Sequence, residues 1–351
     1  MNQTIASVFR YDDLEHSVLL GYYGGGNYGD ELLLEVLMNL FEQHSVDTLT
    51  VAYQHPERYP TYHHEFGYER VEMTDKKAVL QTVIKNKNII IGGGGLWGLD
   101  VNPNIFLLSC LLFVSRWLLF KRVYLLGVGY YDSTSKLGRA SAWLAAKAAG
   151  TIIARDQESL QNFKGVSRHV ALDKDLAWYI SKLNLKPYQP DLAELDGGLR
   201  VAAKTLFITL RRFKSNQKNN YIDYIESCLA NNQQQNIIVA LMEPCGVDPA
   251  GYELLLKWQQ QFGNVQILDF SYNPLALFLF FQKHSHQLSL IGPQFHVILT
   301  AHLTGVPFLP LAYDNKVLEL FKQIAVTQPL LMKDLSPERL QTFINNAKQT
   351  I

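Results

Sequence analysis

Short apolar runs that lead into glycine recur in the first half of the sequence, and they constrain the fold more than any other feature. Three of them cover residues 18–20, 88–91 and 123–127. Helix-length segments between such runs predict a parallel sheet with crossover helices. Ligands of such sheets bind beyond the carboxyl ends of the strands, so these glycine-bearing ends would line one wall of a cleft. The expected strands of the first half are residues 18–20, 49–53, 88–91, 123–127 and 151–154.

The second half of the sequence repeats this organisation. Two prolines, a Gly-Gly pair and no clear periodicity mark residues 182–200 as a linker. Prolines in the last expected strand predict that it is short or lies at a sheet edge, and Ser336-Pro337 opens a terminal helix. The expected strands of this half are residues 205–210, 236–242, 265–268, 288–291 and 307–311. The predicted domains are residues 1–185 and 200–335, followed by a terminal helix within residues 336–351.

Two Rossmann-like parallel α/β domains that face a cleft resemble the GT-B architecture of many sugar-modifying transferases. The length of 351 residues accommodates two such domains with a large core. We therefore expect an α/β, GT-B-like fold.

The charge and cysteine content narrow the range of functions. Lys and Arg number 32 and Asp and Glu number 32, so no strong electrostatic field would attract nucleic acid. Cys110, Cys228 and Cys245 are scattered without metal-ligand spacing, which favours a reduced compartment over a disulfide framework or a zinc site. Residues 1–16 contain no basic segment followed by an apolar core, so we expect no secretory signal and a cytoplasmic protein.

One apolar stretch, residues 105–120, invites comparison with a membrane segment. It is shorter than the roughly 20 residues that cross a bilayer, and it contains Arg116. A buried helix is the main interpretation. Peripheral contact with the inner face of a membrane through an apolar surface is the alternative.

The glycine turn after the first strand matches the G-x-G-x-x-G spacing of dinucleotide sites at Gly24, Gly26 and Gly29. The strand at residues 49–53 does not end in an acidic residue, which would be needed to bind a ribose hydroxyl. Residues 93–98 also match the G-x-G-x-x-G spacing. These features favour glycine-rich floors over a nucleotide cradle, and a tight turn without a ligand is the alternative. Asn27 and Asp30 at the tip of the first turn would suit sugar hydroxyls. The predicted substrate-binding residues of the two segments are Gly24, Gly25, Asn27, Asp30, Gly94 and Gly95.

Three strand ends carry side chains suited to anion and proton chemistry. Arg211 follows the strand at residues 205–210, where it would bind a carboxylate or phosphate or form an interdomain salt bridge. His296 falls in the first turn of a helix, whose positive end disfavours an imidazolium and suits a group that exchanges a proton; a structural histidine is the alternative. Arg155, beside Asp156, is either a substrate ligand or part of a salt bridge and helix cap.

These residues also belong to stretches that resemble the polysaccharide pyruvyltransferase family, whose members move the enolpyruvyl carbons of phosphoenolpyruvate onto two sugar hydroxyls as a ketal. The matching stretches run in order through nearly the whole chain. They are residues 21–31 with Asn27-x-Gly29-Asp30, residues 92–100, Arg155-Asp156 with Ser159, Asp175-Leu176-Ala177, Leu210-Arg211, His296, Gly305-Val306-Pro307 and Tyr313-Asp314-Asn315-Lys316.

The resemblance implies a phosphoenolpyruvate donor, no cofactor, and an acceptor sugar in a cell-surface polysaccharide or its lipid-linked precursor. Arg211 would bind the carboxylate or phosphate of the donor, and His296 would transfer a proton. Asp100, at the end of the second glycine segment, is a candidate base for the sugar hydroxyl, with a helix cap as the alternative. The first domain would hold the acceptor and the second the donor.

One position departs from the family pattern. The family usually has Arg two residues before the site histidine, and this chain has Gln294, which we include among the substrate-binding candidates. Two alternatives therefore stay open. One is a nucleotide-sugar glycosyltransferase of GT-B architecture, for which Asp314 or Glu319 would bind a ribose. The other is a catalytically weakened family member that binds a glycan.

Overall fold

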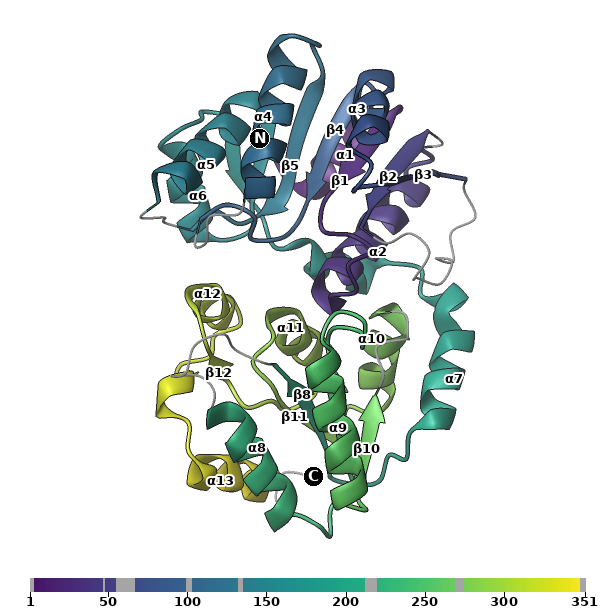
Figure 1. Cartoon of the computed structure of the whole chain (residues 1–351), viewed down its shortest axis with the longest axis vertical. Coiled ribbons are helices and arrows are strands. Elements are labelled where there is room, and N and C mark those ends of the chain that lie inside the picture. The colour runs from purple at the N-terminus through teal and green to yellow at the C-terminus, as the bar shows by residue number, and fades with distance from the viewer. Residues whose placement is uncertain are drawn as a thin grey trace. The chain divides into compact units, whose positions relative to one another are not determined.

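The computed structural model of the chain describes residues 3–46, 48–54, 67–98, 103–131, 135–211, 220–268 and 274–347. These residues form two compact units (Figure 1). Unit 1 comprises Met1–Gly25 and Asp30–Leu183, and unit 2 comprises Gly26–Gly29 and Asn184–Ile351. The tip of the first glycine turn therefore belongs to unit 2, although the domain predicted from the sequence, residues 1–185, includes it.

Unit 1 is built on a seven-stranded parallel sheet in the order β3-β2-β1-β4-β5-β6-β7. Its inner strands are buried apart from Arg122 at the start of β5, as expected for a parallel sheet that helices cover on both faces. The five strands expected from the sequence are confirmed. The strands are β1 (Ser17–Leu20), β2 (Leu49–Tyr53), β3 (Glu69–Glu72), β4 (Asn88–Gly92), β5 (Arg122–Val128), β6 (Thr151–Ala154) and β7 (Val170–Leu172).

The two strands that the sequence pattern missed, β3 and β7, are the edges of this sheet. β3 has the sequence Glu-Arg-Val-Glu, in which Val71 alone is buried, and β7 has three residues with partial exposure. Edge strands are commonly short and charged, because charge blocks pairing with other chains. In β3 the charged residues remove the apolar run by which a strand is recognised in a sequence, whereas β7 is apolar but only three residues long.

The helices of unit 1 begin at polar caps and cover the sheet. Thr4, Asp75, Ser135 and Asp156 each accept a backbone N–H in the first turn of a helix. One face of the sheet packs against α3, α4, α5 and α6 in a single apolar cluster. The helices are α1 (Ile5–Tyr11), α2 (Tyr28–Gln43), α3 (Lys76–Lys85), α4 (Pro103–Trp117), α5 (Lys136–Ala148) and α6 (Gln157–Lys164), with the 3-10 segment η1 (Leu176–Lys182).

Unit 2 contains a four-stranded parallel sheet in the order β10-β9-β8-β11 and a two-stranded sheet, β12-β13. Four of its expected strands are confirmed. The fifth, residues 307–311, makes an isolated bridge at Phe308, and residues 311–312 pair with β13 instead. The strands are β8 (Thr205–Leu210), β9 (Ile237–Leu241), β10 (Val265–Leu268), β11 (Leu288–Ile291), β12 (Leu311–Ala312) and β13 (Leu330–Leu331).

The helices of unit 2 connect these strands and close the chain. Residues 182–200, expected to be a linker without periodicity, contain the short segment η2 and the helix α7. The terminal helix begins at Pro337, as the Ser-Pro pair predicts. The elements are η2 (Lys186–Tyr188), α7 (Gln189–Gly198), α8 (Asn220–Asn231), α9 (Pro249–Gln261), α10 (Pro274–Lys283), α11 (Phe295–Thr304), α12 (Asn315–Gln323), η4 (Met332–Asp334) and α13 (Pro337–Ala347).

Candidate functional site

Arg211 and His296 lie beyond the same edge of the four-stranded sheet in unit 2. β8 and β11 are neighbouring parallel strands, with Ile208 opposite Ile291. Arg211 is the first residue after β8, and His296 is in the first turn of α11, which follows β11. Parallel sheets bind their ligands at this edge. The register of two strands thus brings together side chains that are 85 positions apart in the sequence.

Gln294 links the two strand ends through its side-chain amide. It is the N-cap residue of α11, but its side chain makes no capping hydrogen bond. Instead, Nε2 donates to the carbonyl of Leu210 at 2.9 Å, and Oε1 accepts a short hydrogen bond from Thr209 Oγ1. Leu210 immediately precedes Arg211. The amide therefore fixes the start of the His296 helix against the strand that presents Arg211.

The ring of His296 lies directly against Gly29, which belongs to the same unit. A Cβ atom on Gly29 would lie 2.0 Å from Nδ1 of His296, so any larger residue would push the ring away. Thr300 supports this arrangement, because its Oγ1 donates to the carbonyl of His296 and is hydrogen-bonded to the hydroxyl of Tyr28, both at 2.8 Å. Gly29 of the family-like Asn27-x-Gly29-Asp30 motif therefore provides space for a histidine.

Asn27 brings a residue that the sequence analysis missed, Glu243, into this region. Asn27 Oδ1 accepts the backbone N–H of Gly29 at 3.0 Å, and Asn27 Nδ2 donates to Glu243 Oε1 at 3.2 Å. Glu243 follows the carboxyl end of β9, next to β8 in the sheet. Glu243, like Arg211, is a charged residue just after a buried strand, so the same sequence signal identifies it as a candidate site residue.

Arg211 shares an aromatic ring with a second cation. Its guanidinium carbon lies 4.5 Å from the centroid of the Tyr313 ring, and Nζ of Lys316 lies 5.2 Å from the same centroid. Lys316 Nζ is also 3.4 Å from Asp314 Oδ2. Cation–π contacts hold charged groups in place without neutralising them. This arrangement assigns roles to Tyr313 and Lys316, which the sequence analysis had noted without a function.

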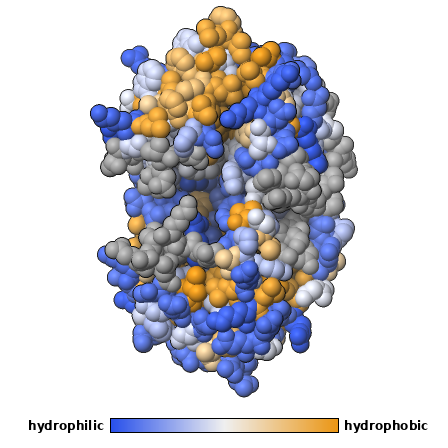
Figure 2. All heavy atoms as spheres, viewed as in Figure 1, coloured by the Kyte–Doolittle hydropathy of each residue, from blue (hydrophilic) through white to orange (hydrophobic). Residues whose placement is uncertain are grey.

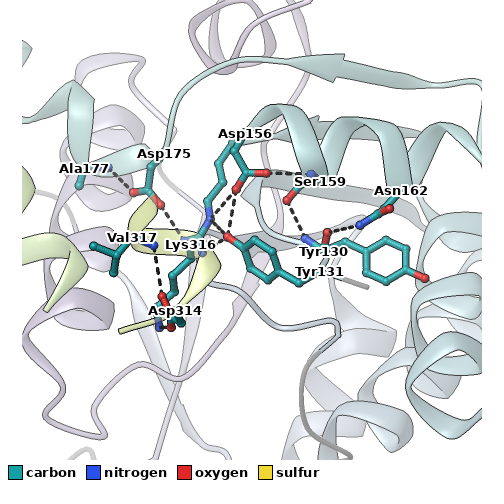
Figure 3. Close-up of polar contacts among 11 residues, drawn as sticks. Tyr130, Tyr131, Asp156, Ser159, Asn162, Asp175, Ala177, Asp314, Lys316 and Val317 are labelled. Carbon is teal, nitrogen blue, oxygen red and sulfur yellow. Dashed lines mark hydrogen bonds and ion pairs between the residues drawn. The ribbon is translucent and has the colours of Figure 1, made fainter. Parts of the chain in front are cut away.

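The two acids considered as ribose ligands have local partners. Asp314 is the N-cap of α12, where its Oδ1 accepts the backbone N–H of Val317 at 3.2 Å (Figure 3). Glu319 forms a short ion pair with Lys322 on the same helix. Both carboxylates therefore have structural roles within α12.

Arg155 is the centre of a buried polar network in unit 1, and Figure 3 labels its partners Tyr131, Asp156 and Asp175. It is 3% exposed and follows the carboxyl end of β6. Nη1 donates to Asp175 Oδ2 at 3.0 Å, Nη2 and Nε donate to the hydroxyl of Tyr131 at 2.7 and 3.2 Å, and Nε lies 3.6 Å from Asp156 Oδ2. Burial by itself would lower the pKa of Arg155, but its interactions with Tyr131 and the two carboxylates raise this pKa above its usual value.

The two carboxylates of this network also cap helical segments. Asp156 accepts the backbone N–H of Ser159 at 2.7 Å, and Asp175 accepts that of Ala177 at 3.0 Å. The observed contacts therefore correspond to the salt-bridge and cap interpretation of Arg155. Its role as a substrate ligand stays a prediction.

The second glycine segment makes room for this network. A Cβ atom on Gly95 would lie 3.1 Å from Nη2 of Arg155, and one on Gly129 would lie 3.0 Å from Nε. Both would also meet the Tyr131 ring. Close approach of the backbone to Arg155 and Tyr131 thus accounts for these glycines without a ligand.

The other candidates from the sequence occupy turns or lie outside the described residues. Gly24 and Gly25 are buried in the turn after β1, Asp30 is in the first turn of α2, and the carbonyl of Gly94 accepts the backbone N–H of Gly129 at 2.8 Å. Asp100 lies outside the described residues. Among the residues that the structure describes, no group of three or more His, Cys, Asp or Glu side chains is arranged to hold a metal ion.

The fold is similar to those of solved enzymes of nucleotide-sugar chemistry. UDP-GlcNAc 2-epimerase from Neisseria meningitidis, solved with UDP-GlcNAc, superposes with a TM-score of 0.61 at 13% identity over 95% of this chain and 91% of that one. HepE from Anabaena, solved with UDP and glucose, gives a TM-score of 0.58 at 16% identity over 96% and 90%. At such identities the likeness establishes the fold, so the expected GT-B class is confirmed.

The sequence places the chain more narrowly within this class. The model of the polysaccharide pyruvyl transferase family matches residues 27–315. The chain therefore belongs to the polysaccharide pyruvyl transferase family, as its motifs indicated. A search of curated proteins found no match.

Replacement of Gly29 by Ala tests the contact with His296. We expect the imidazole to move, because the new methyl group would occupy its place, while stability stays within about 1 kcal/mol of wild type since Ala favours helix over Gly. The measurement is the NMR shift of the His296 ring, assigned with His296→Ala, together with thermal unfolding. Gly197→Ala, at a helical position with open space, is the control. An unchanged His296 resonance in Gly29→Ala would contradict the contact.

Replacement of Asp175 by Ala tests the structural role of the Arg155 network. We expect the free energy of unfolding to fall by about 3–5 kcal/mol, because a buried guanidinium loses a charged partner. Denaturant unfolding measures the loss, and Glu194→Gln, at an exposed carboxylate, should change stability by less than about 0.5 kcal/mol. If Asp175→Ala were as stable as wild type, Arg155 would not depend on this ion pair.

Proposed function

We propose that this chain transfers a pyruvyl group from phosphoenolpyruvate to two hydroxyls of a sugar, as a ketal. One observation carries the proposal: in a member of this family, Arg211 and His296 are fixed by Gln294 at the ends of adjacent strands. The pair combines a planar cation for an anionic donor with a group that exchanges a proton. These are the two functions that the chemistry of phosphoenolpyruvate requires.

The reaction forms two C–O bonds at one carbon of the donor. The oxygen of one sugar hydroxyl bonds to C2 of phosphoenolpyruvate, and the methylene carbon C3 takes up a proton and becomes a methyl group. The bond between C2 and the phosphate oxygen then breaks, and the second sugar hydroxyl bonds to C2. The products are the pyruvyl ketal and inorganic phosphate, which carries the second hydroxyl proton. No electrons are exchanged with a cofactor in this sequence.

Arg211 binds the carboxylate or the phosphate of the donor in this proposal. A guanidinium matches the two oxygens of such a group with parallel N–H donors. Lys316, held beside the same Tyr313 ring, adds a second positive charge. This lysine supplies a cation in the region where Gln294 replaces the usual arginine of the family. Lys316 is also paired with Asp314 at 3.4 Å, so Arg211 is the main cation proposed for the donor.

His296 transfers the proton. Its position in the first turn of α11, against Gly29 and half-buried, suits a ring that exchanges a proton with the donor methylene carbon or with the acceptor hydroxyl. Gln294 is a positioning residue, because its amide holds the start of α11 against β8. Glu243, which accepts a hydrogen bond from Asn27, is a further candidate to orient this region, because Asn27 also accepts the backbone N–H of Gly29.

The acceptor in this proposal is a sugar of a cell-surface polysaccharide or of its lipid-linked precursor, and the reaction takes place in the cytoplasm. Gly24, Gly25, Asn27, Asp30, Gly94 and Gly95 are the proposed contacts of the sugar, with Asp100 as the candidate base. Arg155 is proposed to support this region through its buried network. No cofactor is required.

Replacement of His296 by Ala should lower turnover by about 10²–10⁴-fold, the usual contribution of general acid–base catalysis, with little change in unfolding temperature. The assay follows phosphate release from phosphoenolpyruvate with an acceptor extracted from the cell envelope. His302→Ala is the matched control, because His302 is an exposed residue of the same helix. A His296→Ala enzyme that keeps most of its activity would remove this residue from the mechanism.

The likeness to UDP-sugar enzymes favours a second candidate function, a nucleotide-sugar glycosyltransferase. Ligand-induced stabilisation separates the two. We expect phosphoenolpyruvate, at about 100 times its dissociation constant, to stabilise the protein by about 2.7 kcal/mol, because it binds the folded state only. Arg211→Ala should remove most of this effect and Lys316→Ala part of it, whereas UDP-sugars should give none. Stabilisation by UDP-sugars alone would reverse the assignment.

A third hypothesis is a catalytically weakened member that binds a glycan, which the substitution at Gln294 suggests. Phosphate release that depends on both phosphoenolpyruvate and the acceptor distinguishes this hypothesis from an active transferase. Glycan binding without phosphate release would favour the weakened member.

A further inference from the structure

The solvent-exposed side of α4 and the turn after it form a large apolar surface on unit 1. Figure 2 shows it as an orange area at the top of the view, where Figure 1 places α4 and its connection to β5. Isolated apolar side chains are common on protein surfaces, but a contiguous group marks an interaction site. The exposed large apolar residues of α4 and its turn are Leu107, Val114, Trp117, Leu118, Leu119 and Phe120. We call this set the α4 surface.

α4 lacks the usual pattern of an amphipathic helix, because apolar residues lie on both of its sides. Its inward side packs on the core through Leu112 and the partly buried Ile105, Leu108 and Leu111, and it carries the buried Ser109 and Ser115. Ser109 Oγ accepts the indole N–H of Trp97 at 3.1 Å and donates to the carbonyl of Ile105 at 2.8 Å. A helix on the surface of a water-soluble protein normally directs its polar face outward. The packing within unit 1 therefore does not explain why the outward face is apolar.

The turn after α4 exposes apolar side chains and contains a strained backbone conformation. Leu118 is 70% exposed and Phe120 is 85% exposed. Phe120 also has a φ of 54°, a left-handed conformation that is strained for a bulky residue. The strain and the exposed ring both disfavour phenylalanine here if only the folded chain in water is considered. Insertion of the ring into an apolar medium would explain why residue 120 is phenylalanine.

The neighbouring helix α5 adds aromatic and basic side chains to the same region. The ring of Trp143 stacks on Phe113 of α4 at 6.2 Å between centroids, and Phe113 also contacts Trp117 at 6.3 Å. Arg139, Trp143 and Lys147 are four residues apart in α5 and all exposed, so they form one stripe on its surface. Tryptophan beside Lys or Arg is typical of segments at a membrane–water interface.

The sequence of this region is rich in basic residues, although the whole chain is neutral. From residue 76 to residue 154 the sequence has ten Lys or Arg residues and two acids, Asp100 and Asp132. Both acids lie outside the described residues. Two of the basic residues lie near acids. Lys85 pairs with Glu69, and Arg122 lies close enough to Asp12 to oppose the rise in the pKa of Asp12 that burial causes. The ten basic residues are Lys76, Lys77, Lys85, Lys87, Arg116, Lys121, Arg122, Lys136, Arg139 and Lys147.

We propose that the α4 surface docks on an anionic lipid bilayer, with the turn at residues 117–120 inserted among the headgroups and the basic residues of α3 to α5 facing the lipid phosphates. Each basic residue near an anionic surface favours binding, and the aromatic rings match the interface. A second copy of the chain is a poorer occupant, because a two-fold contact would bring like charges together.

The length of α4 fits docking on the bilayer surface. The helix has 15 residues, whereas about 20 are needed to cross. Within the described part of the chain, none of the helices is both long and apolar enough to span a membrane. This proposal does not depend on the reaction, because it rests on surface composition alone.

Co-sedimentation of the full chain with vesicles tests the proposal. Vesicles of equal parts phosphatidylglycerol and phosphatidylcholine should bind the protein, pure phosphatidylcholine vesicles should bind it at least about tenfold more weakly, and added salt should reduce binding. Leu118→Asp and Phe120→Asn should each weaken binding by about tenfold or more. Charge reversal in Arg139→Glu/Lys147→Glu should weaken binding to the anionic vesicles alone.

The controls separate docking from folding. Asparagine adopts a left-handed backbone more readily than phenylalanine, so Phe120→Asn should have an unfolding temperature equal to or above that of wild type. Leu256→Asp, at a partly exposed leucine of α9 in unit 2, should bind vesicles as wild type does. Leu112 is fully buried, so a charge there would test the core of unit 1 rather than its surface.

Three results would overturn the proposal. They are a wild-type protein that does not sediment with anionic vesicles, variants of the α4 surface that bind as well as wild type, and a dimer in sedimentation velocity that Leu118→Asp dissociates. The last result would assign the surface to a second copy of the chain.

Discussion

The candidate site in unit 2 depends on one side-chain amide. Gln294 joins the first residue of α11 to the last two residues of β8, and so fixes the spacing between the strand end that carries Arg211 and the helix turn that carries His296. Parallel register alone brings two strand ends to one edge, but it leaves the loops beyond them free to vary. An amide has one donor group and one acceptor group, so it can hold a carbonyl and a hydroxyl at once. An arginine has donors only and could not accept the hydrogen bond from Thr209.

Unit 1 uses buried charge where unit 2 uses an amide. Arg155, Asp156, Asp175 and Tyr131 close the carboxyl edge of its sheet and cap two helical segments. Such a network costs desolvation energy, and all of its members must be satisfied for it to persist. The glycines nearby are explained by the room that this network requires. Glycines that leave room for a buried arginine and glycines that bind a sugar give the same pattern in a sequence.

Most of the fold was predictable, because a buried parallel strand is a continuous apolar run. Nine of the strands follow from such runs, as does the terminal helix from its Ser-Pro start. The edge strand β3 was missed because its charged residues leave no apolar run, and β7 was missed because it has only three residues. Residues 307–311 were misread because apolar character does not reveal which strand is the partner. Arg211 and His296 were selected by their places after strands, and the same reasoning overlooked Glu243.

The sequence by itself determined the order of strands and helices, the parallel class of both sheets and the residues that follow the strand ends, because each of these depends on local periodicity. Tertiary structure decided what those residues do. Gln294 meets Thr209 across 85 positions, Asn27 meets Glu243 across 216, and Gly29 serves a histidine in the other half of the chain. Such contacts depend on the register of paired strands and on shape at close approach, and neither quantity is encoded in the pattern of any single segment.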